Sequence, residues 1–265
     1  MNRKNALNIS IIHLPFFGLV GSDRLILDTA ISFQTKGHTV KIYTIDYDPT
    51  MSFADVASVN IISCRTYFPV HWNGFGSRFF YFLKAMVLIF CSFSSILKSD
   101  IVFCDQLPNP ILLLRIISYF WWGKSPFFGF YCHYPDYSDP YKGGGLLKYI
   151  YKDVFNRIER LGMSLADVVY TNSTFTKNAI LGYYPNFPHH KVRVLYPGTP
   201  NAGAINESNF AKDPILSILK GSVILSSINR ITPFKKIERV IKLVSEMKKH
   251  YANFITVIAG GNWDN

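Results

Sequence analysis

Short apolar runs alternate with longer amphipathic segments along most of this 265-residue chain. The runs have the length of buried strands, and the segments between them carry apolar residues at helical spacing. Strands that alternate with helices fold into a mostly parallel sheet with helices on both faces. The chain is therefore predicted to be an α/β protein with a Rossmann-like, doubly wound parallel sheet.

The same rhythm predicts the individual elements. Strands are expected at residues 8–14, 39–45, 60–63, 101–104, 127–132, 167–171 and 192–195. Helices are expected at residues 22–36, 79–97, 110–119 and 146–165. Ser22 is a suitable N-cap for the first of these helices, and Gly37 is a suitable residue to end it.

A stretch without periodicity divides the chain. Residues 197–214 contain Pro, Gly, Asn and Ser, which predicts a linker between domains. It separates an N-terminal Rossmann-like domain, residues 1–196, from the start of a second domain, residues 215–265. That second part holds one strand–helix–strand unit, which has too little core to stand alone. We expect the second domain to be only begun within this sequence.

The composition limits the classes of partner. A formal charge of +11 suits an anionic partner, either a nucleotide diphosphate, a nucleic acid or an acidic membrane surface, and it also fits an ordinary basic surface. Nucleic acid is not expected, because the basic residues are not interleaved with aromatic residues. No metal-ligand spacing, phosphate-binding P-loop or nucleophile elbow occurs, so neither a metal nor a cofactor is expected.

The cysteines and the N-terminus bear on the compartment. The four cysteines form no C-x-x-C pair and each lies in an apolar run, which indicates buried free thiols in a reducing compartment. The apolar stretch at residues 9–14 is too short for the core of a signal peptide. The chain is therefore expected on the cytosolic side.

Two apolar segments raise the question of a membrane. Residues 79–97 approach the roughly 20 residues that span a bilayer, but Lys84 lies inside them and predicted strands flank them. We expect a helix that packs on the sheet and touches a membrane with its outer face; a buried core helix and a true span are the alternatives. Residues 111–122 end in aromatic residues, Tyr119 to Trp122, that are typical of an interfacial anchor or of core packing.

Polar residues that follow predicted strands are the candidate site. Gly21 lies in the turn that opens the first helix, where backbone N–H groups can bind an anion. His133 and Asp136 follow a strand and could orient a sugar hydroxyl or a proton, or be structural. Asn172 and Ser173 follow another strand and could cap a helix or contact a sugar.

The second unit contributes two cations. Arg230 ends its first strand, and Lys235 follows where the helix begins. Two cations at a helix N-terminus would neutralise a diphosphate, and a departing nucleotide diphosphate needs that stabilisation in the transition state.

These segments together resemble a known family. The sequence is similar to the retaining glycosyltransferases of family 4 with the GT-B fold, and within them to the α-1,3/1,6-mannosyltransferases of early dolichol-linked oligosaccharide assembly. The strings that carry the resemblance are Gly21–Asp28, Val40–Thr44, Val102–Gln106, Phe130–Asp136, Thr171–Thr176, Val194–Pro197 and Ser227–Arg230 with the lysines after it.

The resemblance implies a donor, an acceptor and a location. The donor would be GDP-mannose, and the acceptor a dolichyl-diphosphate-linked Man-GlcNAc2. The enzyme would work at the cytosolic face of the endoplasmic reticulum membrane. By the same resemblance Gly21, Arg230 and Lys235 bind the donor diphosphate, and His133 lies beside the donor sugar as a catalytic residue. Asp136, Asn172 and Ser173 are possible sugar or acceptor contacts.

The sequence departs from the family in two places. Val20 replaces a glycine and Asp23 replaces a glutamate, and a valine there restricts how closely the backbone approaches a phosphate. The family's glutamate pair for the donor sugar and ribose lies outside these 265 residues, so we expect little or no turnover from this chain alone. A non-catalytic partner that binds the lipid-linked acceptor, and a family 4 transferase for another sugar nucleotide, remain the alternatives.

Overall fold

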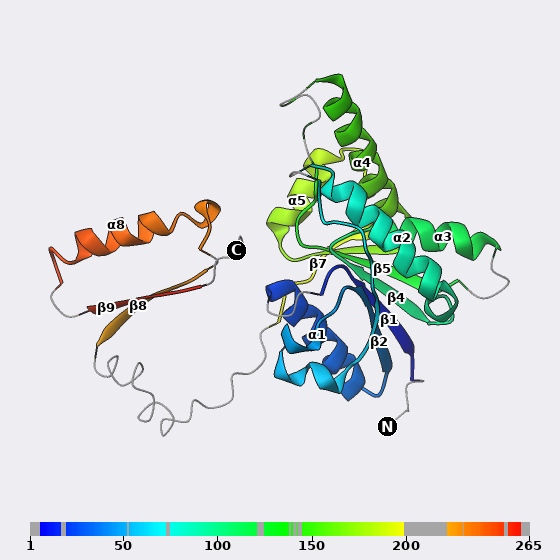
Figure 1. The fold of residues 1–265 in the computed structure, drawn as a ribbon, viewed down its shortest axis with the longest axis horizontal. Helices are drawn as coiled ribbons and strands as arrows, with labels where there is room; N and C mark the ends of the chain where they lie inside the picture. The colour runs from blue at the N-terminus through cyan, green and yellow to red at the C-terminus, as the bar shows by residue number, and fades with distance from the viewer. Residues whose placement is uncertain are drawn as a thin grey trace. The chain divides into compact units, whose positions relative to one another are not determined.

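The structure is a computed structural model. It describes residues 6–16, 20–51, 53–72, 75–120, 125–137, 139, 142, 145–198, 222–229, 231–251 and 254–260. The chain divides into two compact units, Met1–Pro200 and Asn201–Asn265 (Figure 1).

The first unit is built on one parallel sheet. Its strands are β1 (Asn8–His13), β2 (Thr39–Ile45), β3 (Asn60–Cys64), β4 (Ile101–Asp105), β5 (Phe127–Cys132), β6 (Val168–Thr171) and β7 (Val192–Val194). They lie in the order β3-β2-β1-β4-β5-β6-β7, and every neighbouring pair is parallel. The order reverses between β1 and β4, which makes the sheet doubly wound. The predicted α/β class is confirmed.

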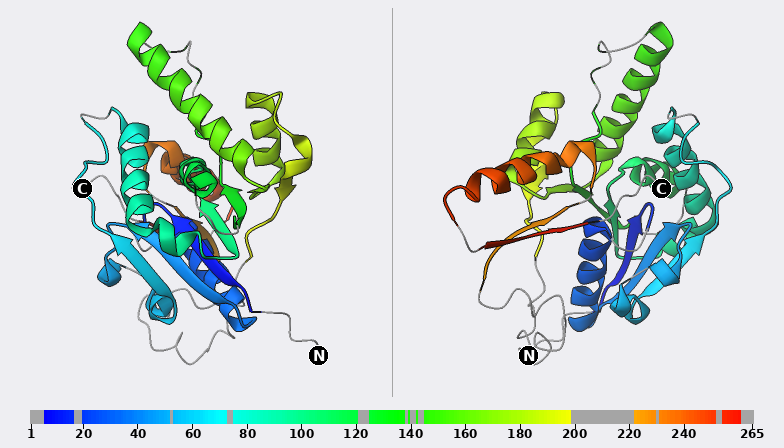
Figure 2. Two further views of the ribbon diagram at one scale, coloured as in Figure 1. Left: turned by 90° about the vertical axis from the view of Figure 1, so that its right-hand side faces the viewer. Right: turned by 60° about the vertical axis from the view of Figure 1, so that its left-hand side comes forward.

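Helices cover both faces of this sheet. They are α1 (Gly21–Thr35), α2 (Ser77–Ile96), α3 (Asn109–Phe120), α4 (Leu146–Leu165) and α5 (Thr174–Tyr183). The buried residues Ile26 and Leu27 of α1 pack on one face. Leu88 of α2, Leu114 of α3 and Met163 of α4 belong to the core on the other face. Both views of Figure 2 show these two layers and show α4 extending past the sheet.

Short 3-10 helices occupy some of the connections. They are η1 (Pro49–Met51), η2 (Ala54–Ser58) and η3 (His189–Lys191).

The helix boundaries differ from the prediction at the start of α1. Its N-cap is Val20, which makes no side-chain cap, so Ser22 is not the N-cap. Gly37 follows the helix with a φ of 87° and donates its N–H to the carbonyl of Gln34, as its predicted role requires.

The apolar helix α2 packs against the sheet of the first unit. Of the described helices it alone is long and apolar enough to cross a membrane. One side of it is buried on the sheet, and its charged residue Lys84 lies on that side. The Lys84 ammonium lies 2.7 Å from Oδ2 of Asp46, just after β2. Because burying an unpaired ammonium is costly, this ion pair explains how a lysine fits in an apolar helix. Phe79 and Phe90 remain exposed.

The cysteines are free. Cys104 and Cys132 are buried and Cys64 is half-buried, but Cys91 is exposed on α2. The expectation of four buried thiols is therefore wrong for Cys91, because the outer side of α2 faces away from the core.

The second unit contains a parallel pair of strands. β8 (Val223–Ile228) pairs with β9 (Phe254–Ala259), and η4 (Pro233–Lys235) and α8 (Ile237–Met247) connect them. The strand–helix–strand unit predicted for residues 215–265 is present, but Lys236, whose φ is 49°, separates η4 from α8. Most of the predicted linker, from residue 199 onward, lies outside the described residues.

Candidate functional site

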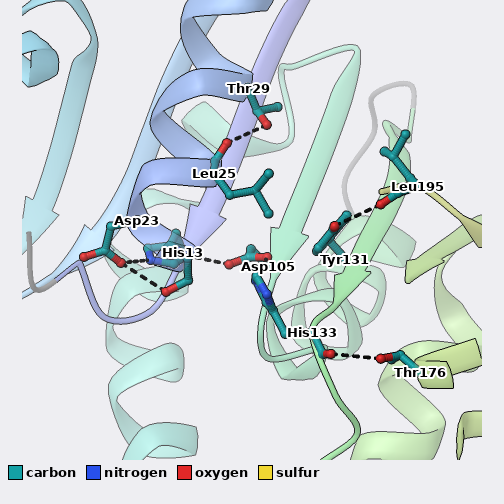
Figure 3. A network of polar contacts seen from close by, with 10 residues as sticks. His13, Asp23, Leu25, Thr29, Asp105, Tyr131, His133, Thr176 and Leu195 are labelled. Carbon is teal, nitrogen blue, oxygen red and sulfur yellow. Dashed lines mark hydrogen bonds and ion pairs between the residues drawn. The ribbon is translucent and has the colours of Figure 1, made fainter. Parts of the chain in front are cut away.

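Three polar residues meet at the carboxyl ends of the central strands. His13 ends β1, Asp105 ends β4, and His133 follows β5. His13 and Asp105 are in register as partners on neighbouring parallel strands. The carboxyl edge at the switch point of a doubly wound sheet is where such folds bind ligands. Figure 3 shows the three side chains converging there.

His13 lies between two carboxylates. Its Nδ1 is 2.7 Å from Oδ2 of Asp105, and its Nε2 is 2.7 Å from Oδ1 of Asp23 in the first turn of α1. All three side chains are fully buried. Burial alone would lower the pKa of His13, but the hydrogen bonds and charges of Asp105 and Asp23 outweigh it and raise the pKa to about 9. His13 is therefore an imidazolium that donates both of its N–H groups.

Asp105 joins the two histidines. Its Oδ2 accepts from His13, and its Oδ1 is 2.9 Å from Nε2 of His133. Burial alone would raise the pKa of this carboxyl, but the bonds from His13 and His133 lower it. An ionised Asp105 accepts hydrogen from Nε2 of His133, so the network fixes which ring nitrogen of His133 carries that proton.

His133 presents its other side to solvent. Its side chain is 30% exposed, whereas that of Asp105 is fully buried. The ring of Tyr131 packs edge-on against the imidazole with centroids 5.2 Å apart. Among the described residues Nδ1 of His133 makes no hydrogen bond, so a neutral ring offers this nitrogen as an acceptor for a ligand hydroxyl. The ring is thus held on one edge and open on the other.

The start of α5 is hydrogen-bonded to the loop that carries His133. Ser173 is the N-cap, and its Oγ accepts the backbone N–H of Thr176 at 3.2 Å. The Thr176 hydroxyl lies 2.6 Å from Oδ1 of Asn172 and 3.2 Å from the His133 carbonyl oxygen. Asn172 and Ser173 thus hold the helix start against the loop, and their contact with a sugar stays a prediction.

Asp136 and Gly21 are not part of the hydrogen-bond network of His13, Asp105 and His133. Asp136 faces Arg78, with its Oδ2 3.4 Å from Nε. Gly21 is the first residue of α1, and a Cβ built there would meet no atom within 4 Å. The space beside Gly21 is therefore open, as an approaching ligand would require.

The two predicted cations belong to the second unit. Lys235 is the last residue of η4, just before α8. Arg230 lies outside the described residues. Their part in binding a diphosphate stays a prediction.

Two buried members of the site were missing from the candidates. His13 sits at the end of the first predicted strand, and Asp105 immediately follows the predicted strand 101–104. A polar residue that ends a buried apolar run was the signal available for both. In the described part of the chain no group of three or more His, Cys, Asp or Glu is placed to hold a metal ion.

Sequence comparison identifies related proteins. The curated relatives include the α-1,3/1,6-mannosyltransferases ALG2 of Rhizomucor pusillus (29% identical over 97% of this chain and 56% of the relative) and Saccharomyces cerevisiae (30%, 100% and 52%). The human ALG2 is 27% identical over 94% of this chain and 60% of its own length. The chain spans about half the length of these relatives.

Solved structures share the fold. Sucrose-phosphate synthase from Thermosynechococcus elongatus superposes with a TM-score of 0.64 and 14% identity, over 96% of this chain and 62% of that chain. The trehalose-6-phosphate protein from E. coli bound with UDP-2-fluoro glucose gives 0.62 and 13%, over 97% and 65%. These neighbours are GT-B proteins, so the GT-B prediction is confirmed.

The family profile covers most of the chain. The description "Glycosyltransferase Family 4" belongs to a profile that matches residues 20–201. This range takes in the start of α1 with Asp23, the end of β4 with Asp105, and the loop that carries His133. The chain belongs to glycosyltransferase family 4.

Proposed function

We propose that this protein is a retaining mannosyltransferase that moves mannose from GDP-mannose to a dolichyl-diphosphate-linked Man-GlcNAc2 acceptor. One observation supports it most. His133 is anchored to the buried Asp105 by a 2.9 Å hydrogen bond while its other edge stays open at the carboxyl end of the sheet. The similarity to mannosyltransferases over nearly the whole chain supports the choice of mannose.

Each site residue has a role in this proposal. The acceptor hydroxyl attacks the anomeric carbon of mannose as the bond to GDP breaks, and its proton passes to the oxygen of the departing diphosphate. Nδ1 of His133 accepts a hydrogen bond from a hydroxyl of the donor sugar and so holds the anomeric carbon in place. Arg230 and Lys235 stabilise the charge of the leaving diphosphate. The open space at Gly21 lets that diphosphate approach the first turn of α1.

The buried His13 has a supporting role. As an imidazolium it places a positive charge beside Asp105 and holds that carboxylate in one orientation. Asp105 in turn fixes the ring of His133. Groups held in this way are preorganised, so the donor sugar meets a rigid acceptor nitrogen.

The membrane location belongs to the same proposal. A lipid-linked acceptor keeps the enzyme at the cytosolic face of the endoplasmic reticulum membrane. Phe90 on α2 and Tyr119 and Phe120 at the end of α3 are exposed, which suits contact with an interface. The net charge of +11 suits an anionic headgroup layer. Trp121 and Trp122, the rest of the predicted anchor, lie outside the described residues.

A transfer assay tests the proposal. The chain is expressed in membranes alone and, in parallel, joined after Ala259 to the C-terminal remainder of the S. cerevisiae relative. Both preparations receive labelled GDP-mannose and a phytanyl-diphosphate-linked mannosyl-chitobiose. We expect the joined protein to form a mannosylated lipid and its Arg230→Ala variant to lose this activity. Binding of the acceptor without transfer in either preparation would support the non-catalytic alternative instead.

A further inference from the structure

A cavity of about 260 Å³ with both polar and apolar walls lies beside the site in the first unit. The N-terminal turns of α2 contribute Arg78 and Tyr81 to its wall, and α4 contributes Phe155 and Glu159. Leu107 and Pro108 from the loop after β4, Asn109 at the start of α3 and Asp136 from the loop after β5 also line it. The two loops that lead away from Asp105 and His133 therefore continue into this cavity.

Asn109 is the most informative residue of the cavity. It is only 6% exposed, yet its side-chain amide makes no hydrogen bond to any described residue. The amide atoms are not sealed from solvent, so water or a ligand in the cavity can bond to them. Because Asn109 lines the cavity, a molecule in the cavity can supply a partner for the amide.

The charged residues of the cavity hold one another in place. Nη1 of Arg78 donates to Oδ1 of Asn156 at 2.9 Å, and its Nε lies 3.4 Å from Asp136. Glu159 accepts the backbone N–H of Asp136 and the hydroxyl of Tyr184, each at 2.6 Å. The guanidinium is therefore fixed, with N–H groups left over for a ligand.

The balance of charge disfavours an anionic ligand. The cavity has one cation, Arg78, against two carboxyl groups, Asp136 and Glu159. A phosphate would face repulsion from both carboxyl groups, whereas neutral hydroxyls can accept from the guanidinium and donate to the carboxylates.

Aromatic rings complete the wall. Phe155 offers an apolar face, and Tyr81 offers a ring together with a hydroxyl that has no hydrogen bond within the described residues. A pyranose has the matching surface, since its C–H face packs on a ring while its hydroxyls point to polar groups. Pockets that combine an apolar wall with a few fixed polar groups are typical of small-molecule sites.

We propose that this cavity binds an uncharged pyranose of the acceptor, with Asn109 and Arg78 as its hydrogen-bonding partners. The proposal rests on the proposed transferase function, because only then does a second sugar need a place beside His133. The loops shared with Asp105 and His133 would set the distance between the bound acceptor and the donor sugar.

Direct binding to the 265-residue chain tests the cavity. N,N′-diacetylchitobiose, methyl α-mannoside and inorganic phosphate are titrated and followed by saturation-transfer NMR. We expect one of the two sugars to bind and phosphate not to displace it. Asn109→Leu keeps the side-chain volume but removes the amide, so it should weaken binding by roughly fivefold to tenfold. It should leave the melting temperature close to that of wild type, because the amide makes no hydrogen bond to a described residue.

Two further variants complete the design. Arg78→Lys should weaken sugar binding as well, because an ammonium cannot reproduce the fork of a guanidinium. Arg157→Ala removes a cation that is 78% exposed on the same helix α4 and should change nothing. The cavity proposal is overturned if the folded chain binds neither sugar, if phosphate displaces the bound sugar, or if binding survives Asn109→Leu and Arg78→Lys.

The transfer assay distinguishes a failure of the cavity proposal from a failure of the proposed transferase function. In the joined protein, Asn109→Leu should raise the KM for the acceptor and leave the KM for GDP-mannose unchanged. Transfer with an unchanged acceptor KM would contradict the cavity and keep the transferase. Sugar binding that Asn109→Leu removes, with no transfer in any preparation, would contradict the transferase and keep a sugar-binding cavity.

Discussion

His13 and Asp105, the last residues of two neighbouring parallel strands, form a fully buried hydrogen-bonded pair with 2.7 Å between Nδ1 and Oδ2. Asp23 accepts from the opposite nitrogen of the same ring. Two buried carboxylates flank one imidazolium, and one of them also holds His133. The stability of the sheet edge and the orientation of His133 therefore depend on the same group of charges.

The raised pKa of His13 predicts a pH dependence of stability. Its pKa is about 9 in the folded protein against an ordinary value of 6.5. A group whose pKa is raised by folding contributes its full stabilisation below pH 6.5 and loses it as the pH rises toward 9. The free energy of unfolding should therefore fall across this window, by on the order of 3 kcal/mol if the whole shift is realised.

Urea unfolding between pH 6 and 9 measures this effect. The wild-type midpoint should decline across the window, and His13→Gln, which has no titrating ring, should be less stable at pH 6 and show a flatter profile. A wild-type midpoint that is constant or rises with pH would show that His13 is not charged in the folded state.

Removing the charge of Asp105 should be costly. Asp105→Asn leaves His13 and His133 without their shared carboxylate, and breaking one partner of a buried ion pair costs roughly 3 to 5 kcal/mol. Asp153→Asn is the matched control, since its carboxylate pairs with Arg157 at a partly exposed position on α4 and should cost less than about 1 kcal/mol. Equal unfolding midpoints for the two variants would be inconsistent with the buried network.

Two glycines in helices should respond oppositely to alanine. A Cβ at Gly162 of α4 would lie 2.7 Å from the carbonyl oxygen of Pro108, so Gly162→Ala must push α4 away from that loop. We expect a loss of roughly 1 to 3 kcal/mol. At Gly182 of α5 nothing lies within 4 Å, so Gly182→Ala should stabilise by up to about 1 kcal/mol. Thermal unfolding of both variants measures the contrast.

The exposed end of α3 should contribute to membrane contact. Tyr119 is 86% and Phe120 is 73% exposed. The double substitution of Tyr119→Ser with Phe120→Ser should reduce cosedimentation with vesicles that contain anionic lipid, because it removes apolar surface from the interface. Phe175→Ser, at a 71% exposed position on α5, is the control. If the double variant sediments like wild type, Tyr119 and Phe120 do not contribute to membrane contact.

Much of the fold could be predicted because it depends on short-range patterns. Strands β2 and β5 were predicted with the bounds that the structure shows, since each is an apolar run with polar or turn residues beside it. The start of α1 was predicted less well. Ser22 has the right chemistry for an N-cap, but the helix begins one residue earlier and Asp23 turns inward to His13.

The candidate site was predicted only in part, and the reason is physical. His133 and Asp136 stand in one loop, so sequence proximity alone put them together. His13, Asp105 and His133 are separated by many residues and meet only because the sheet order places β4 between β1 and β5. Asn109 gives no signal in sequence, because its importance comes from lining a cavity that only the folded chain forms.

The most direct test of the account is the rate of mannosyl transfer in the joined protein with and without the His133 imidazole. His133→Ala should lower the rate by roughly 100-fold or more, since positioned groups of this kind contribute such factors. Its melting temperature should fall less than that of Asp105→Asn, because Asp105 keeps its bond from His13. Transfer from GDP-mannose that persists in His133→Ala, or no transfer from the intact joined protein, would contradict the account.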